Sequence, residues 1–271
     1  MQNLKNYGIL LLKVRKGIRK KMSKICVFDT ETTSLDKPFC YNVGYVIADP
    51  ESDTILLRRD FVVEQIWHNL PLFQSAYYAA KRPLYINRMR ARLATLDKFG
   101  YICQQMIRDF RQYEVAAAYA FNSDFDERVF AFNCDWYKCN NPFDNIPVYD
   151  IRAFAVNHIA FTDGYQAFCD KFSLYTESGN YSTTAEAFFK YIADANFVEE
   201  HTALADSICE YGILKYLYDN SCDISQFETA PKIVKKEMSH NWEVKRGSET
   251  ILKFEAKNVT VYKNNYTIRI R

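Results

Sequence analysis

The stretch ICVFDTETTSL, residues 25–35, runs four apolar residues directly into Asp29 and places a second carboxylate, Glu31, two positions later. Alternate side chains of a β-strand point to the same face, so these two acids lie side by side. They repel one another there unless a cation lies between them. An Asp-x-Glu pair alone is a weak signal, because one is expected about once by chance in a chain of this size. A solvated strand end is the alternative interpretation.

The pattern of apolar residues along the chain predicts a mixed α/β fold. Apolar runs at 25–29, 43–49 and 54–63 predict three strands in an antiparallel meander. The other expected elements are broken helices at 64–96, strands at 115–121 and 146–151, and helices at 97–113, 124–137, 150–158, 164–171, 183–194 and 202–219. Three strands followed by alternating strands and helices favour a mixed β-sheet flanked by helices over a sandwich or a bundle.

The two ends of the chain differ from its middle in charge. Residues 1–24 hold eight Lys and Arg and no acid, and residues 222–271 carry a net charge of +4, so residues 25–221 carry −10 within a total of +2. We expect a basic N-terminal extension at 1–23, a folded domain at 24–220, and a linker with a small β-meander at 221–271, with a turn at Asn264-Asn265. Basic ends either attract a polyanion or are merely solvated.

Cysteine usage and hydropathy indicate the compartment. The eight cysteines include no CxxC pair, which predicts reduced thiols and no structural zinc site. The apolar run at 9–12 is too short for a membrane span or a secretion signal. A cytoplasmic protein, in the cytosol of a bacterial or other host cell, is therefore expected. Its richness in Lys, Asn, Tyr and Phe suits an A+T-rich genome, such as a viral one.

Two further segments place acids where a strand ends or a helix begins. The first, AFNSDFDERVF at 120–130, has Asp124 and Asp126 at the start of a helix, where either acid can simply cap it. The second, EEHTALADSICEYGILKYLY at 199–218, has His201 before a helix and Asp206 on its first turn. An acid on the core-facing side of such a helix is costly unless it is paired or bound to a metal.

These acids form a cluster if the strand ends and helix starts converge. The four candidates are Asp29, Glu31, Asp126 and Asp206. Several carboxylates in one place require cations, and ligation by oxygen alone suits Mg²⁺ or Mn²⁺.

Three motifs resemble those of a known family. FDTETT at 28–33, NSDFD at 122–126 and HTALAD at 201–206 resemble the motifs of the DEDDh exonucleases, the superfamily of proofreading 3′→5′ exonucleases and RNase T. H-x-A-x-x-D is specific for the histidine branch, and the resemblance covers about 24–219. Many relatives carry His where Phe121 stands here. This departure leaves the metal ligands unaffected and bears on substrate contacts.

The resemblance implies a ribonuclease H-like fold and a two-metal reaction. Two Mg²⁺ (or Mn²⁺) ions would be held by Asp29, Glu31, Asp126 and Asp206, with His201 as the general base. Nucleoside 5′-monophosphates would be removed from the 3′ ends of single-stranded nucleic acid. The family acts on both DNA and RNA, and our own expectation is that DNA is favoured over RNA.

Substrate contacts are expected from two regions. The resemblance implies that residues just after Glu31 hold the terminal nucleotide, here Thr32 and Leu35, and Asn122 of the second motif is expected there as well. Arg82 and Arg88 lie in the segment 73–92, which interleaves aromatic and basic residues. Aromatic rings stack on unpaired bases and Arg tracks phosphates, so this segment is expected along the path of the strand. An ordinary amphipathic helix pair with a solvated face is the alternative.

Two other functions fit the sequence. One is a non-catalytic or recruitment subunit that binds nucleic acid and docks a polymerase or another protein partner through the C-terminal β region. Retention of all five site residues argues against an inactive enzyme. The other is a nuclease for short or cyclic oligonucleotides, with residues 64–96 closing over the site.

Overall fold

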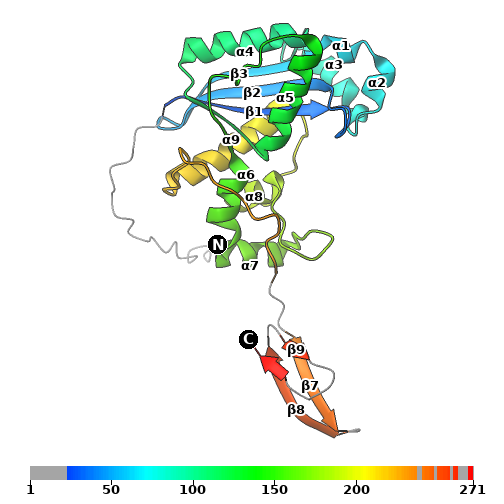
Figure 1. Cartoon of the computed structure of the whole chain (residues 1–271), viewed down its shortest axis with the longest axis vertical. Helices are drawn as coiled ribbons and strands as arrows, with labels where there is room; N and C mark the ends of the chain where they lie inside the picture. The colour runs from blue at the N-terminus through cyan, green and yellow to red at the C-terminus, as the bar shows by residue number, and fades with distance from the viewer. Residues whose placement is uncertain (1–22, 237–239, 247–248, 257–258, 262–267, 271) are drawn as a thin grey trace, which may run out of the picture.

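Six β-strands form one mixed sheet at the centre of the molecule (Figure 1). The computed structural model describes residues 23–236, 240–246, 249–256, 259–261 and 268–270. The strands of the sheet lie in the order β4-β3-β2-β1-β5-β6. Their bounds are Ile25–Thr32 (β1), Cys40–Asp49 (β2), Thr54–Val63 (β3), Thr95–Asp97 (β4), Ala117–Ala120 (β5) and Val148–Asp150 (β6).

The pairing of the strands confirms the predicted mixed sheet. β1, β2 and β3 form an antiparallel meander, whereas β5 pairs with β1, β6 with β5, and β4 with β3 in parallel. The sequence prediction is wrong at β4, which covers the last two residues of the segment 64–96 expected to be helical and the first residue of the helix expected at 97–113. A strand of three residues is too short to show a period of two.

One face of the sheet is covered by two long helices, α4 (Phe99–Tyr113) and α5 (Ser123–Tyr137) (Figure 1). Cys26 and Phe28 of β1 point into this first core, where the Phe28 ring stacks on Phe143 with centroids 4.2 Å apart. Short helices lie at the end of the sheet where β1 ends. They are α1 (Glu64–Trp67), α2 (Leu70–Gln74), the 3₁₀ turn η1 (Ala79–Lys81) and α3 (Arg82–Arg90).

The opposite face is covered by the later helices (Figure 1). They are α6 (Ile151–Ala155), the π-helical turn η2 (Val156–Ala160), α7 (Asp163–Phe172), α8 (Ala185–Ile192) and α9 (Ala203–Asp219). Ile25 and Val27 point into this second core. The start of α9 packs directly on β2 at Gly44, where a Cβ atom would lie only 2.0 Å from the backbone nitrogen of Leu204. Glycine at this position therefore lets α9 approach the end of the sheet.

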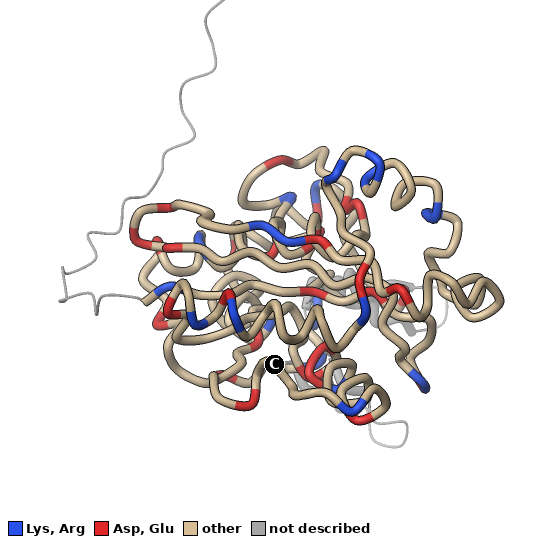
Figure 2. Tube along the Cα trace, turned by 90° about the horizontal axis from the view of Figure 1, so that it is seen from above, with Lys and Arg blue, Asp and Glu red and all other residues tan. Residues whose placement is uncertain are grey.

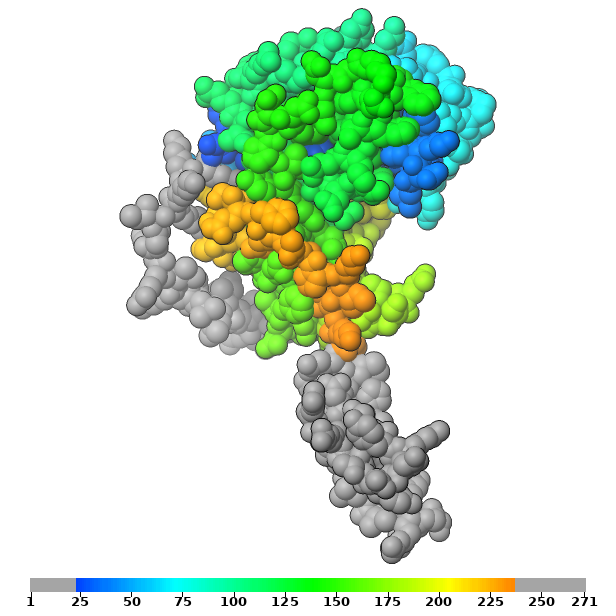
Figure 3. All heavy atoms as spheres, in the orientation of Figure 1, coloured from blue at the N-terminus to red at the C-terminus, as the bar shows by residue number. Residues whose placement is uncertain are grey.

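The segment expected to be a linker, 221–236, lies on the surface of the second core (Figure 3). Ile224 and Val234 are buried there. The Tyr119 hydroxyl donates to the carbonyl oxygen of Ile224 at 2.7 Å, and the Tyr181 N–H donates to that of Val234 at 3.1 Å. These contacts attach the segment to the α/β body.

The C-terminal β region contains two strand pairs. β7 (His240–Arg246) pairs with β8 (Glu249–Ala256), and β9 (Val259–Val261) pairs with β10 (Ile268–Ile270), both antiparallel. The turn expected at Asn264-Asn265 and residues 1–22 of the expected basic extension lie outside the described residues.

All eight cysteines are free thiols. Three of them, Cys103, Cys134 and Cys139, lie together, with their sulfur atoms within 4.8 Å of one another.

Basic and acidic residues are interspersed over the body in the view of Figure 2. Among the described residues, no helix combines the length and the apolar character that crossing a membrane requires.

Candidate nuclease active site

Three carboxylates meet where β1 ends and α9 begins. Asp29 and Glu31 follow Ile25 and Val27 on the face of β1 that α9 covers, because side chains alternate along the strand. Asp206 lies on the first turn of α9. One carboxylate oxygen from each of Asp29, Glu31 and Asp206 lies within 4.8 Å of the others. Asp29 and Glu31 of the first motif are thus joined by Asp206, which lies 175 residues after Glu31 in the sequence.

The fourth predicted acid, Asp126, lies beside this group on the other side of β1. It is on the first turn of α5 and is buried, and its Oδ1 accepts a hydrogen bond of 2.6 Å from the Thr30 hydroxyl. Its negative charge reaches Asp29, since after burial it is the largest cause of the raised pKa of Asp29. Asp124, two residues earlier, is exposed. The structure therefore separates the two acids of the second motif, and only Asp126 faces the site.

Burial and mutual repulsion favour the protonated form of these acids. Burial and the charge of Asp206 raise the pKa of Glu31 to about 8, although the hydroxyl of Tyr41 donates to Glu31 Oε2 at 3.3 Å. Burial and the charge of Glu199 raise the pKa of Asp206 to about 8. Burial raises the pKa of Asp126 to about 7. A bound cation would reverse these shifts, because it favours the charged form of each carboxylate.

Two acids that the sequence prediction omits also belong to the site. Glu210 is buried one turn after Asp206 on α9, and its Oε2 accepts a hydrogen bond of 3.3 Å from the Phe121 N–H. Burial and the charge of Asp126 raise the pKa of Glu210 well above its ordinary value. The sequence could have indicated Glu210, because it lies four residues after Asp206 and so on the same face of the helix. Glu199 lies before α9, and its Oε2 is 3.5 Å from His201 Nδ1.

His201 lies at the edge of the carboxylate group. Its backbone has φ of 52°, in the left-handed region, and its N–H donates to Asp206 Oδ1 at 3.2 Å. Its imidazole is half-buried and stacks on the Tyr78 ring. Burial, followed by the charge of Lys81, lowers the pKa of His201 below its ordinary value. The imidazole is therefore neutral at neutral pH and has a free lone pair for a proton.

The residues expected at the terminal nucleotide lie at different places around the site. Asn122 lines an open cleft of about 440 Å³, together with Asp29 and Arg152, and its N–H donates to Asp150 Oδ1 at 2.8 Å. Leu35 projects into solvent with 79% of its surface exposed. The Thr32 hydroxyl donates to the carbonyl oxygen of Ser34 at 3.2 Å.

The two arginines expected along the strand path have protein partners. The Arg82 guanidinium lies 3.9 Å from the centroid of the Trp67 ring and donates to the Trp67 carbonyl oxygen at 3.1 Å. Arg88 pairs with the buried Asp60 at 2.8 Å and with Glu200 at 3.7 Å. The pair of Arg88 with Asp60 attaches α3 to β3, and the contacts of Arg82 join α3 to α1. A role for either arginine in binding substrate stays a prediction.

The fold is that of ribonuclease H-like exonucleases. The nuclease domain of 3′hExo, a DEDDh family member solved bound to rAMP, is similar to this chain at 12% identity, covering 79% of this chain and 97% of that one, with a TM-score of 0.50. A 3′-exonuclease solved with a histone mRNA stem-loop has 13% identity, 76% and 85% coverage, and a TM-score of 0.55. Exonuclease I of E. coli, solved with a 5cy-dT13 oligonucleotide, has 15% identity, 74% and 41% coverage, and a TM-score of 0.53.

No protein-family model and no curated protein sequence matches the chain. At 12–15% identity the structural likeness shows the fold alone. It confirms the resemblance to the DEDDh exonucleases at the level of the fold.

Proposed function

We propose that this protein is a metal-dependent 3′→5′ exonuclease that removes nucleoside 5′-monophosphates from single-stranded nucleic acid, with DNA favoured over RNA. The observation that carries the proposal is the meeting of Asp29, Glu31 and Asp206, whose carboxylate oxygens lie within 4.8 Å of one another. The fold, shared with solved 3′ exonucleases, supports the same reaction class.

The site fits divalent metal ions because of its donor set. Hard carboxylate oxygens are the ligands that Mg²⁺ and Mn²⁺ prefer. Asp29, Glu31 and Asp206 would hold one ion, and Asp29 with Asp126 would hold a second. Bound there, the ions would activate the attacking water and neutralise charge on the scissile phosphate. The raised pKa of Asp29 is a further sign of fit, because a cation would relieve the repulsion that contributes to it.

His201 is proposed as the proton acceptor of the reaction. Its lowered pKa keeps the imidazole neutral at neutral pH, and its place beside Asp206 puts it next to the carboxylates. A general base of this kind accepts the proton of the attacking water. Glu199, 3.5 Å from His201 Nδ1, orients the ring and leaves Nε2 for the proton.

The cleft beside the carboxylates is proposed to hold the 3′-terminal nucleotide. Asn122 lines this cleft. Thr32 and Leu35 come shortly after Glu31, where β1 ends. The exposed Leu35 side chain offers an apolar surface to a base. Ribose and deoxyribose differ by one hydroxyl, so the preference for DNA is tested directly on matched strands.

The test uses 5′-labelled single-stranded DNA and RNA of one sequence, with Mg²⁺, Mn²⁺ or EDTA. We expect a ladder that shortens from the 3′ end with either metal, faster on DNA, and no cleavage in EDTA. Asp29→Asn should abolish cleavage. The matched control is Asp124→Asn, which removes an exposed acid two residues from Asp126 and should leave the rate unchanged.

Other outcomes select the alternatives. If the wild-type protein cleaves neither strand with any metal but still retards them on a gel, the exonuclease proposal is wrong and a binding or recruitment subunit is favoured. If only the shortest strands of a length series are degraded, the enzyme acts on short oligonucleotides.

A further inference from the structure

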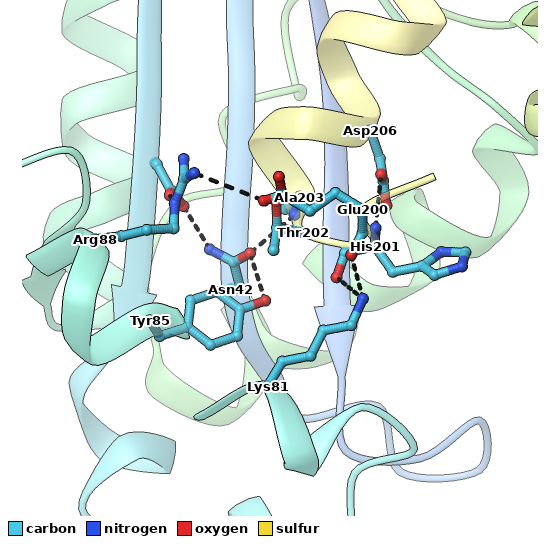
Figure 4. Close-up of polar contacts among 10 residues, drawn as sticks. Asn42, Lys81, Tyr85, Arg88, Glu200, His201, Thr202, Ala203 and Asp206 are labelled. Atoms are coloured by element: carbon cyan, nitrogen blue, oxygen red, sulfur yellow. Dashed lines mark hydrogen bonds and ion pairs between the residues drawn. The ribbon is translucent and has the colours of Figure 1, made fainter. Parts of the chain in front are cut away.

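The helical segment 64–94, which contains α1, α2, η1 and α3, contacts the loop that carries His201. Lys81, at the end of η1, donates from Nζ to the backbone carbonyl oxygens of Glu200 and His201, the latter at 3.2 Å (Figure 4). The Tyr78 ring stacks on the imidazole of His201, with centroids 4.7 Å apart and planes inclined by 13°. Lys81 Nζ also lies 4.5 Å from the centroid of the Tyr78 ring. One segment thus holds both the backbone and the side chain of this loop.

The loop adopts a backbone conformation that needs support. His201 is not glycine, yet its φ of 52° lies in the left-handed region, where the Cβ atom of such a residue crowds the following carbonyl oxygen. This conformation lets its N–H donate to Asp206 Oδ1. It also directs the carbonyl oxygens of Glu200 and His201 to a single ammonium group (Figure 4). A bond from a charged donor is worth more than one between neutral groups, so Lys81 offsets the strain.

A second attachment fixes the same loop from the side of the sheet. Asn42 of β2 is fully buried, and its Oδ1 accepts hydrogen bonds from the Ala203 N–H at 2.9 Å and the Tyr85 hydroxyl at 3.1 Å. Arg88, one turn after Tyr85 on α3, pairs with Glu200. Figure 4 shows these contacts beside the Lys81 contacts. The helical segment 64–94 therefore contacts the start of α9 and the loop before it at two places, through Lys81 and through Tyr85 and Arg88 of α3.

We propose that Lys81 and Tyr78 are positioning residues that hold His201 in place for catalysis. Lys81 fixes the backbone of the loop, and Tyr78 fixes the plane of the imidazole. The helical segment 64–94 then affects the rate of turnover through the position of His201. The ammonium of Lys81 donates hydrogen bonds to the protein backbone and does not bind a substrate phosphate. The proposal rests on the proposed function, in which His201 is the proton acceptor.

The kinetic test compares Lys81→Met with Lys81→Arg, Tyr78→Ala and Tyr78→Phe under saturating substrate. We expect Lys81→Met to lower kcat about tenfold, the worth of one charge-assisted hydrogen bond, with KM within about twofold of the wild type. Lys81→Arg, which keeps the positive charge, should retain most of the wild-type rate that Lys81→Met loses. Tyr78→Phe, which retains the ring, should likewise retain most of the rate that Tyr78→Ala loses. The control is Arg111→Met, which removes one exposed positive charge from α4, outside the segment expected along the strand path, and should change neither constant.

A double-mutant cycle shows whether Lys81 acts through His201. If it does, Lys81→Met has no further effect on kcat once His201→Asn has been introduced. If both variants lower kcat independently, or if Lys81→Met raises KM alone, Lys81 contacts the substrate and the proposal is overturned.

A measurement without substrate separates this proposal from the nuclease itself. Hydrogen exchange of the His201 amide should be about tenfold faster in Lys81→Met than in the wild type or Arg111→Met. If the wild-type protein shows no nuclease activity while this difference is present, the proposed function fails and the support of the loop by Lys81 stands. Equal exchange in all three proteins overturns the positioning role even when the enzyme is active.

Discussion

Without divalent ions, the carboxylate cluster should make the folded protein less stable as the pH rises. The pKa of Glu31 is raised to about 8 by burial and the charge of Asp206, and the pKa of Asp206 is raised to about 8 by burial and the charge of Glu199. The same acids titrate near pH 4 in an unfolded chain. Between about pH 4 and pH 8 the folded state therefore keeps protons that the unfolded chain has released. Stability that is present below this window is lost as the pH rises through it.

The size of the loss follows from the number of retained protons. One such proton changes the free energy of unfolding by about 1.4 kcal/mol per pH unit. Glu31 and Asp206 lie within 4.8 Å of one another and titrate together, so we count one proton for the pair. Between pH 5 and pH 7 this pair contributes a loss of about 2.7 kcal/mol, to which the raised pKa values of Asp29, Asp126 and Glu210 add. Asp206→Asn removes one acid and one repulsive charge, and should reduce the contribution of the pair to about half.

Urea unfolding at pH 5, 6 and 7 in EDTA measures this loss. The wild type is compared with Asp206→Asn and with Asp124→Asn, whose exposed acid should leave the pH dependence unchanged. Adding Mg²⁺ at pH 7 should raise the free energy of unfolding of the wild type, and should raise that of Asp206→Asn far less. The reasoning is refuted if wild type and Asp206→Asn depend equally on pH, because the cluster would then hold no extra protons.

Three substitutions test other parts of the structure. His201→Asn should lower the exonuclease rate about 10²-fold or more in a single-turnover assay, with little change in Tm, because the residue lies on a loop. Gly44→Ala should lower Tm strongly in a thermal scan, since the added Cβ meets the Leu204 nitrogen at 2.0 Å; an unchanged Tm would mean that α9 does not pack there. Arg88→Met should cost about 3–5 kcal/mol in urea unfolding, because it leaves Asp60 buried without its partner.

The elements that the sequence predicts well are those with a local pattern. The strands at 25–32 and 54–63 and the long helices α4 and α9 show apolar patterns that the chain carries within each segment. β4 shows no such pattern, because three residues at the edge of a sheet are placed by their neighbour β3 and not by their own period. The same limit applies to 221–236, whose buried Ile224 and Val234 are held by contacts with the second core.

The candidate site divides in the same way. Asp29, Glu31, Asp126, His201 and Asp206 are readable as three short motifs, since each motif lies within six residues of chain. The second motif names Asp126 as the site residue, and the packing of α5 on β1 agrees, because it buries Asp126 and leaves Asp124 exposed.

The sequence by itself determined the composition of the site: an acid pair at a strand end, and a histidine and an acid at a helix start. Only the tertiary structure decided what surrounds them. Lys81 reaches the His201 carbonyl across 120 residues of chain, and Asn42 receives the Ala203 N–H across 161. Such contacts depend on how the helices and the sheet stack, which no local pattern specifies. The sequence thus named the groups able to do the chemistry, and the packing of the layers supplied the residues that hold them in place.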